Sequence, residues 1–555
     1  MLLDCALFIS NGKLLGVVPK NIKTRWFNTA TAKTFIYDNY EVAISDKLIF
    51  ASMCKIGICV GAMNNEKLST LNNAELIINI DAQPYYHNYF EDTINELASL
   101  SKFSNQAIVY ANTNPCESTT DYVYTSLLAV FECGKQVLNK NYKHQNSFSF
   151  DTNCYSAEID IDIVRAIRKK KSIENKMIDL AVSQNQIINF ELPTKKINTI
   201  NRFTTNHLHS KHNDFSNRQN TCNKESSNEH NENELKSFYI DPFLTHKIKY
   251  SSQAIDIVTV QALGLAKRLR HINSNNVVIG ISGGIDSTLA LLVCDKCFDI
   301  LGYPKNNINA VFMPCFGTSA ESARIAKQLA EALTVNYIEI PITDAVTQHF
   351  KDISHNAEVR NLVYENSQAR QRTMILFNYA NKTNGIVVGT GNMSEIALGW
   401  STYNADHISN YNVNCGIPKT VAKAILEFYI YSKANPKIDG NLIARILERP
   451  ISPELLPADE NNEIQSTEQI IGQYELHDFF LFYHLSYFLS KEKLLYIAKY
   501  SFSNKYSVEE IENTLDIFLH RFHQSQYKRS CSTDGPSIFS VSLSPRTGFV
   551  LPSDI

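Results

Sequence analysis

The sequence predicts an α/β protein, with a doubly wound parallel sheet in the C-terminal half preceded by a strand-rich layered domain. From about Tyr250 onward, apolar strand runs alternate with stretches of helical periodicity. Strands separated by helices of this length form parallel sheets that helices cover on both faces. Before about Lys195, short apolar runs follow one another with few helices between them, which is typical of an α+β or sandwich arrangement.

The intervening segment, residues 199–237, is dominated by Asn, Ser, His, Lys and Glu. Such a composition buries too little apolar surface to offset the entropy of ordering, so it predicts a polar linker or insert. At 555 residues the chain is too long for one ordinary core. We therefore expect domains at 1–195 and 241–555, joined by a segment at 196–240. The polar composition of this linker explains its histidines better than a metal site does. They are His207, His209, His212 and His230.

The N-terminal domain is expected to begin with a hairpin. The runs 2–10 and 13–20 flank Asn11 and Gly12, which form the strongest short signal for a two-residue hairpin turn. The periodicity of 90–103 predicts a helix. Further strands are predicted by the apolar runs LIFAS (48–52), KIGICV (55–60), AELIINI (74–80) and QAIVYAN (106–112).

The C-terminal domain repeats a unit of strand and helix. Its apolar runs are short and end in Gly, Pro or Ser, whereas the stretches between them have the period of a helix. The predicted order is a helix at 254–272, a strand at 275–282, a helix at 287–302, a strand at 307–314, a helix at 319–334 and a strand at 335–342.

Charge and cysteine usage limit the classes of partner and compartment. A formal net charge of -3 leaves no basic footprint for nucleic acid, so small-molecule partners are expected. No apolar run approaches the roughly 18 residues of a membrane span, and the residues after Met1 lack the basic start of a signal peptide. Twelve scattered cysteines suggest reduced thiols, and the close pair Cys294 and Cys297 is assigned to helix packing. We therefore expect a cytoplasmic protein without membrane or nucleic-acid partners.

The strongest local chemistry lies in VIGISGGIDS, residues 278–287, where a buried strand runs into a glycine-rich turn and a helix. Gly283 and Gly284 allow backbone angles at which consecutive N–H groups face one anion. Ser282 and Ser287 add hydroxyl donors, and the helix directs its positive N-terminal end to the same point. A carboxylate such as Asp286 repels phosphate unless Mg²⁺ bridges the two. The turn therefore predicts a phosphate site with a magnesium ion, although the Walker A pattern is absent.

This SGGxDS turn resembles the pyrophosphate loop of the ATP pyrophosphatase group, whose members split ATP between the α and β phosphates to adenylate a substrate. The segments downstream are similar to the NAD⁺ synthetase family, and they follow in the same order over most of residues 250–535. They are YENSQARQR (364–372), IVVGTGNMSEIALGWSTY (386–403), HISNYNVNCGIPKT (407–420), SPELLP (452–457), TEQIIGQYELHDFFL (467–481) and YKRS (527–530).

The resemblance implies two substrate sites and one metal site. One departure lies in Tyr403-Asn-Ala-Asp-His-Ile, which carries an extra residue beside the commoner Tyr-Gly-Asp-His pattern. ATP would be held by Gly280, Ile281, Ser282, Gly283, Gly284, Ile285, Asp286, Ser287, Thr390 and Lys419. Deamido-NAD⁺ would be held by Asn366, Arg370, Glu395, Trp400, Ser401, Thr402, Tyr403 and Lys528. Mg²⁺ would be held by Asp286 and Glu395.

The chemistry of these side chains agrees with the implied roles. Trp400 and Tyr403 offer flat faces to a pyridine or adenine ring, and Lys528 and Arg370 offer cations to a carboxylate or phosphate. The implied reaction has two steps: the nicotinate carboxylate of deamido-NAD⁺ attacks the α-phosphorus of ATP, and ammonia then displaces AMP to give NAD⁺. Positioning and electrostatics suffice, without a protein nucleophile.

The N-terminal runs are similar to the nitrilase-like (carbon–nitrogen hydrolase) glutaminase domain, an α-β-β-α sandwich fused to many NAD⁺ synthetases. That domain frees ammonia from glutamine with a Glu, Lys and Cys triad. Lys20 matches the family lysine and Cys59 the family cysteine. The family glutamate would precede the strand at 2–10, where the chain begins, so we expect a truncated domain.

Further departures affect this glutaminase half. Val60-Gly61 replaces the Glu-Asp pair after the cysteine, and Gln83 and Tyr89 stand where the family has the serine and arginine that hold glutamine. The loop after Lys20 is shortened. Because loss of a general base removes typically 10²- to 10⁴-fold of rate, we expect impaired glutaminase activity, with ammonia, free or from a partner, as the nitrogen donor.

Alternative hypotheses remain open. The chain could be a fully glutamine-dependent NAD⁺ synthetase with Cys59 as an active nucleophile, and a mis-assigned start codon would account for the missing glutamate. It could instead be a non-catalytic descendant that serves assembly or regulation, or a tRNA-modifying relative. The resemblance also leads us to expect a homo-oligomer.

Overall fold

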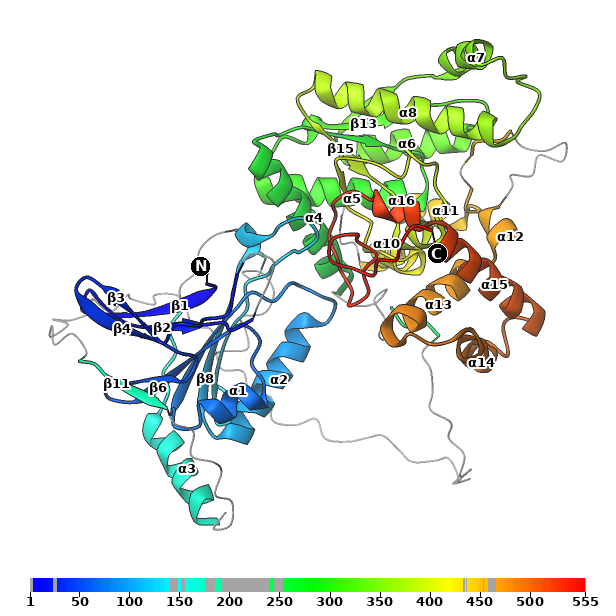
Figure 1. Ribbon diagram of the computed structural model, residues 1–555. Helices are drawn as coiled ribbons and strands as arrows, with labels where there is room; N and C mark the ends of the chain where they lie inside the picture. Colours follow the sequence, from blue (N-terminus) through cyan, green and yellow to red (C-terminus); the bar gives the residue numbers. More distant parts are fainter. Residues whose placement is uncertain are drawn as a thin grey trace, which may run out of the picture. The chain divides into compact units, whose positions relative to one another are not determined.

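The computed structural model describes residues 3–22, 27–138, 148–150, 155–174, 185–191, 240–243, 253–432, 435, 437–452, 454–457 and 466–554 (Figure 1). Residues 196–239 of the expected linker, with its four histidines, lie outside this set. The described chain divides into two compact units. The first takes in residues 3–60, 65–77 and 185–191, and the second takes in 61–64, 78–174 and the described residues from 240 onward. These units do not coincide with the ranges 1–195 and 241–555, so that domain division stays a prediction.

Two sheets build the first unit. One has the order β1-β2-β4-β3 and begins with the expected hairpin, whose turn residues Asn11 and Gly12 adopt φ of 50° and 75°, the positive values that a type I′ turn requires. In the other, β5 pairs antiparallel with β6 and parallel with β11. The strands are β1 (Cys5–Ser10), β2 (Lys13–Pro19), β3 (Thr34–Tyr37), β4 (Tyr40–Ile44), β5 (Leu48–Ala51), β6 (Lys55–Val60) and β11 (Gln186–Asn189).

The two sheets pack face to face through an apolar core. Phe8 of β1 stacks on Phe50 of β5, with ring centroids 3.9 Å apart. Val18 of β2 and Ile58 of β6 belong to the same buried cluster. A Cβ at Gly16 would lie 2.8 Å from the Phe50 ring, so glycine is what permits this close approach. The expected layered arrangement is therefore present within this unit.

In the second unit, α2 (Tyr89–Ser104) packs against β8 (Ala107–Asn112) and β9 (Leu128–Glu132). The strands β8 and β9 are antiparallel, and β10 (Lys135–Gln136) pairs antiparallel with β9. This helix and strand β8 confirm the elements predicted at 90–103 and 106–112.

The second unit also contains a parallel sheet of five strands, in the order β14-β13-β12-β15-β16. Each neighbouring pair is parallel, so the predicted α/β class and parallel sheet are confirmed. The strands are β12 (Val277–Gly280), β13 (Ile308–Phe312), β14 (Asn336–Glu339), β15 (Ile386–Gly389) and β16 (Tyr411–Asn412). The chain moves outward from β12 to β14 and returns to β15 on the other side of β12, which places a topological switch point between β12 and β15.

Right-handed crossovers in opposite directions put helices on opposite faces of this sheet. The helices α5 (Ile285–Leu301) and α6 (Ala320–Ala332) pack on β13, whereas α8 (Leu362–Lys382) packs on β12 and β15. Figure 1 shows α5 and α8 on either side of β13 and β15. The sheet is thus doubly wound, as predicted.

The core fills both faces of the sheet. Val278 of β12 and Val387 of β15 join a buried cluster with Phe350 of α7 (Thr343–Asp352) and Tyr364 of α8. On the other face, α5 packs against α4 (Gln253–Ile272). Cys294 and Cys297 of α5 are fully buried, and burial raises the pKa of both thiols, which confirms their assignment to packing.

The remaining elements complete the two units. None of the helices in the described part of the chain is both long and apolar enough to cross a membrane. The elements are α1 (Asn65–Thr70), β7 (Leu76–Asp81), α3 (Ile161–Glu174), α9 (Met393–Leu398), α10 (Lys419–Ser432), α11 (Gly440–Glu448), α12 (Thr467–Ile471), α13 (Tyr474–Tyr487), α14 (Lys491–Ser501), α15 (Val508–Gln524) and α16 (Gln526–Ser530).

Candidate active site

A cavity of about 800 Å³ opens where β12 and β15 end, at the switch point where ligands bind in sheets of this type. The structure brings together in its lining every residue predicted for ATP and deamido-NAD⁺ binding. These are Gly280, Ile281, Ser282, Gly283, Gly284, Ile285, Asp286, Ser287, Thr390, Lys419, Asn366, Arg370, Glu395, Trp400, Ser401, Thr402, Tyr403 and Lys528.

Hydrogen bonds of its own serines stabilise the glycine-rich turn. Oγ of Ser282 and Oγ of Ser287 lie 3.1 Å apart, and the N–H of Gly284 donates to Ser282 Oγ over 3.3 Å. Gly283 has φ of 76°, and a Cβ there would lie 2.9 Å from the carbonyl oxygen of Ser322. Only glycine fits at this position. The turn leads directly into α5, whose N-terminal end favours negative charge.

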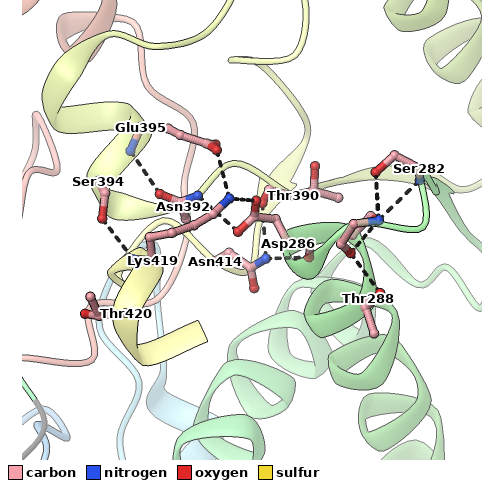
Figure 2. A network of polar contacts seen from close by, with 12 residues as sticks. Ser282, Asp286, Thr288, Thr390, Asn392, Ser394, Glu395, Asn414, Lys419 and Thr420 are labelled. Atoms are coloured by element: carbon pink, nitrogen blue, oxygen red, sulfur yellow. Dashed lines mark hydrogen bonds and ion pairs between the residues drawn. The ribbon is translucent and has the colours of Figure 1, made fainter. Parts of the chain in front are cut away.

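A charged trio lies beside the turn (Figure 2). Nζ of Lys419 pairs with Oδ2 of Asp286 and lies 3.3 Å from Oε1 of Glu395. Burial raises the pKa of the Glu395 carboxyl to about 7, against the opposing effect of the Lys419 ammonium. Burial also acts to lower the pKa of Lys419, but Asp286 and Glu395 outweigh it and hold that pKa above its ordinary value. The ammonium therefore stays charged between two carboxylates.

Two buried asparagines hold the segments that carry these carboxyl groups. Asn392, the N-cap of α9, donates from Nδ2 to Oδ1 of Asp286 over 3.0 Å and accepts from the N–H of Glu395 over 2.9 Å. Asn414 donates to the carbonyl oxygens of Asp286 and Thr390 over 2.9 and 3.1 Å. These bonds connect the first turn of α5 with the end of β15, so the trio has little freedom to move.

A third carboxylate, that of Asp478 in α13, holds the start of α10. It accepts hydrogen bonds from the hydroxyl of Ser394 and from the N–H and hydroxyl of Thr420, the last two over 3.0 and 2.7 Å. Burial raises the pKa of Asp478 to about 6, although these hydrogen bonds act to lower it. Since Lys419 precedes Thr420 in α10, the same bonds position its side chain.

Two aromatic side chains, Trp400 and Tyr403, line another part of the cavity. Trp400 is half-buried and carries the guanidinium of Arg521 over its ring, 4.7 Å from the centroid. Tyr403 is exposed and stacks on His407, with ring centroids 5.2 Å apart. Both rings can offer an edge or a face to a planar ligand.

The turn between these aromatics is stabilised by Lys528. Its Nζ donates to the carbonyl oxygens of Gly399 and Ser401 over 2.8 and 2.6 Å, and burial lowers its pKa. Gly399 has φ of 58°, and a Cβ there would overlap Oγ of Ser525. Thr402 donates to Oδ1 of Asn366 over 2.8 Å, which connects this turn to α8.

The extra residue of the 403–408 loop is absorbed in a tight turn. Asn404 has φ of 57°, a conformation that asparagine tolerates well. Its N–H donates to Nδ1 of His407 over 3.0 Å, and Oδ1 of Asp406 accepts from the N–H of Thr402 over 2.8 Å. The insertion therefore leaves Tyr403 and Asp406 in the lining of the cavity.

A divalent cation would find two hard oxygens in this site. Oδ2 of Asp286 and Oε1 of Glu395 point to one position, which the ammonium of Lys419 takes. Mg²⁺ is bound through one or two carboxylates together with phosphates of a substrate, so the donor set fits this ion. Within the described ranges, no three His, Cys, Asp or Glu side chains are grouped to hold a metal. The fit therefore depends on a phosphate to complete the coordination.

Several lining residues were missed by the sequence analysis: Arg372, Asp406, Arg449, Glu454 and Arg521. Glu454 lies in the SPELLP segment, and Arg372 ends the YENSQARQR segment, so both had a signal in the motifs. Arg449 and Arg521 had no such signal in the sequence, because each reaches the cavity from an element outside these motifs.

The two predicted glutaminase residues lie in the first unit, apart from this lining. Nζ of Lys20 lies 3.4 Å from Oδ2 of Asp4. Cys59 is 4% exposed, near the end of β6. In the second unit, Tyr89 is fully buried, and its hydroxyl lies 3.1 Å from that of Tyr110.

The comparisons with known proteins concern both halves of the chain. Residues 257–530 match the family model described as NAD synthase. A glutamine-dependent NAD(+) synthetase of Mycobacterium leprae is 38% identical over 319 residues, which cover 53% of this chain and 47% of that protein. The glutamine-dependent NAD(+) synthetase of Mycobacterium bovis is 29% identical over 599 residues, covering 100% of this chain and 82% of its own.

Among solved structures, a glutamine-dependent NAD(+) synthetase from Cytophaga hutchinsonii has a TM-score of 0.67 and 15% identity, over 99% of this chain and 82% of that one. At this identity the likeness shows the fold alone. It extends over both units of the chain.

Proposed function

We propose that this chain, which belongs to the NAD⁺ synthetase family through residues 257–530, converts deamido-NAD⁺ to NAD⁺ with ATP and ammonia. The prediction of an enzyme of this family is confirmed by that match and by the relatives named as NAD(+) synthetases. The observation that carries the proposed reaction is the single cavity in which all the predicted nucleotide-binding residues meet.

The first step would transfer AMP to the nicotinate carboxylate. A carboxylate oxygen forms a bond to the α-phosphorus of ATP, the bond from that phosphorus to the bridging oxygen breaks, and the bridging oxygen leaves with its electron pair on pyrophosphate. The turn at 282–287 would receive the pyrophosphate, since its N–H groups, two serine hydroxyls and the N-terminus of α5 all favour an anion. The carboxylate and the α-phosphate repel each other until a cation lies between them.

Lys419 supplies that cation from the protein. Its ammonium lies between Asp286 and Glu395, from where it would reach an α-phosphate oxygen as charge develops. Mg²⁺, when bound by the same two carboxylates, would supply further neutralisation of the phosphates. Asn392 and Asn414 keep the backbone that carries the two carboxyl groups in place, so little reorganisation is needed during the reaction.

The second step would be attack of ammonia on the acyl carbon of the adenylate. The carbon–nitrogen bond forms, the bond from the acyl carbon to the AMP oxygen breaks, AMP leaves as an anion, and the nitrogen loses one proton to solvent. Trp400 and Tyr403 would hold the pyridine ring by stacking. The cation of Arg370 would bind a phosphate of deamido-NAD⁺.

We further propose that the glutaminase half contributes little, which supports ammonia as the donor. The Lys20 ammonium is engaged with Asp4, and Val60 and Gly61 supply no acid next to the cysteine. Tyr89, aligned with the arginine that holds glutamine in the family, is buried against Tyr110. A persistent thiolate needs a base or a nearby cation.

The test is NAD⁺ formation by the full chain with ammonium chloride or with glutamine. We expect turnover with ammonium and at least about tenfold lower kcat/KM with glutamine, and we expect Cys59→Ala to leave the ammonium reaction unchanged. Because the Mycobacterium bovis relative, matched over the whole of this chain, is named as glutamine-dependent, the rival function is glutamine-dependent synthesis. Equal efficiency with glutamine, abolished in C59A, would establish that rival instead.

A further inference from the structure

Arg449 brings a positive charge to the end of the phosphate turn that lies away from the charged trio. It follows α11 directly, lines the cavity, and has a side chain that is 21% exposed. Its Nη1 lies 3.5 Å from the carbonyl oxygen of Gly283, at the outer limit of a hydrogen bond. This contact is too long to hold a guanidinium by itself, so Nη1 remains available to a better acceptor.

The other half of the guanidinium is firmly held. Nη2 of Arg449 donates to a carboxylate oxygen of Glu454, to Oγ of Ser322 over 2.6 Å and to Oγ of Ser319 over 3.3 Å. The hydroxyl of Ser322 in turn lies 2.6 and 2.7 Å from the two oxygens of Glu454. These bonds all engage Nη2, so they fix the plane of the guanidinium while Nη1 faces the turn.

The backbone around Glu454 is adapted to this arrangement. Glu454 has φ of 48°, a left-handed conformation that costs about 1 kcal/mol or more for a residue with a side chain. A Cβ at Gly317 would lie 2.6 Å from the carbonyl oxygens of both Glu454 and Leu456. The segment therefore packs tightly onto the loop before α6, and this packing maintains the strained residue.

The charged groups beside the turn lack the positive charge that a pyrophosphate group requires, and Arg449 supplies it. Two carboxyl groups, those of Asp286 and Glu395, face the one ammonium of Lys419. That cluster carries no excess positive charge for a pyrophosphate group. A guanidinium offers pairs of N–H donors with the geometry of phosphate oxygens.

We propose that Arg449 binds the β- and γ-phosphates of ATP and the departing pyrophosphate through Nη1, and that Glu454 is the residue that positions it. The inference rests on the proposed function, since it assigns a role within the same reaction. As the bond between the α-phosphorus and the bridging oxygen breaks, negative charge grows on the pyrophosphate oxygens, and the hydrogen bonds from Arg449 strengthen. The arginine forms no covalent bond and loses no proton.

The test compares ligands that contain the β-phosphate with one that lacks it. Binding of inorganic pyrophosphate and of AMP, each with Mg²⁺, is measured by calorimetry for the wild type and for Arg449→Met in the full chain. We expect R449M to lose roughly 10- to 100-fold in pyrophosphate affinity, as for one charge-assisted hydrogen bond, while AMP binds within about twofold of the wild type. The matched control is Arg445→Met. Arg445 belongs to α11 and does not line the cavity, and its guanidinium pairs with Glu321 and Gln328.

Two further variants separate binding from a structural role. Arg449→Lys keeps the charge and should recover part of the pyrophosphate affinity, and it serves also if R449M fails to fold. Glu454→Gln should raise the KM for ATP with a smaller effect on the KM for deamido-NAD⁺. The proposal is overturned if R449M binds pyrophosphate as the wild type does, or if it loses AMP and pyrophosphate affinity equally. These binding measurements do not require NAD⁺ formation, so a wild type that makes no NAD⁺ would reject the proposed function without deciding the role of Arg449.

Discussion

At the scale of single residues, the site depends on one ammonium between two carboxylates. Lys419 is 4% exposed, and its contacts with Asp286 and Glu395 compensate the cost of burying three charged groups. Removal of the lysine would leave two carboxylates facing each other at the position where phosphates must bind. If the proposed reaction is correct, the lysine of this trio therefore controls both the affinity for ATP and the stabilisation of the transition state.

We predict that Lys419→Met lowers the rate of adenylation by about 10²- to 10³-fold, the range found when one preorganised donor to a developing charge is removed. The measurement is exchange of labelled pyrophosphate into ATP in the presence of deamido-NAD⁺ and the absence of ammonia. Lys423 lies one turn further along α10 and is exposed, so Lys423→Met is the control and should exchange at the wild-type rate. Exchange by K419M at more than about a tenth of the wild-type rate would contradict this role.

At the scale of elements, α13 joins the site to the surrounding helices. Asp478 on one side of this helix holds the start of α10. His477, the residue before it, is 1% exposed and lies 2.8 Å through Nε2 from the carbonyl oxygen of Ile471. Its ring also lies 6.2 Å from that of Phe518 in α15. The helix thus carries a polar contact to the site and a buried imidazole in its packing against α15.

The buried imidazole predicts sensitivity to acid. Burial lowers the pKa of His477 from its ordinary value of 6.5 to about 4. Between these values the unfolded chain binds more protons than the folded one, so the contribution of His477 to stability is present above pH 6.5 and is lost as the pH falls toward 4. We expect the free energy of unfolding in urea to decrease over this range.

His477→Gln is expected to show a smaller decrease over the same range, because glutamine has no charge to gain. His520 of α15 is exposed, so His520→Gln serves as the matched control and should keep the wild-type slope. If H477Q and the wild type lose stability in parallel between pH 6.5 and 4, the imidazole is not the group responsible.

At the scale of the whole molecule, the C-terminal segment returns to residues near the start of the second unit. Asp121 is 1% exposed and accepts hydrogen bonds from Arg546 through Nη2 and Nε, over 2.8 and 3.2 Å. The hydroxyls of Ser544 and Thr547 donate to the same carboxylate. Residues more than 400 positions apart are thereby joined by an ion pair whose carboxylate is buried.

We predict that Arg546→Met destabilises the protein by about 3 kcal/mol, because it leaves the buried carboxylate of Asp121 without its cation. Denaturant unfolding measures this loss. The exposed pair of Lys499 and Glu512 provides the control, since Lys499→Met should change stability by less than about 1 kcal/mol. The double variant D121N/R546M should lose less than the sum of the two single variants, because their effects are coupled. Additive losses would show that the two side chains do not interact in solution.

The sequence by itself determined the features that depend on neighbouring residues. The alternation of strands and helices predicted the parallel sheet, the Asn11-Gly12 pair predicted the hairpin, and the glycine-rich turn at 282–287 predicted the phosphate site. The first two are confirmed, because hydrophobic period and turn chemistry are local properties of the chain, whereas the phosphate site stays a prediction. The motif resemblance added other residues that line the cavity, but it missed Arg372, Asp406, Arg449, Glu454 and Arg521.

Only the tertiary structure decided which distant groups meet. The placement of Arg449 by Glu454 and Ser322, the support of α10 by Asp478, and the pairing of Asp121 with Arg546 have no local signal, because their partners come from separate elements. A buried charge must find a partner wherever the fold brings one. The sequence therefore identified the turn proposed to bind the nucleotide, whereas the fold selected the charges that surround it.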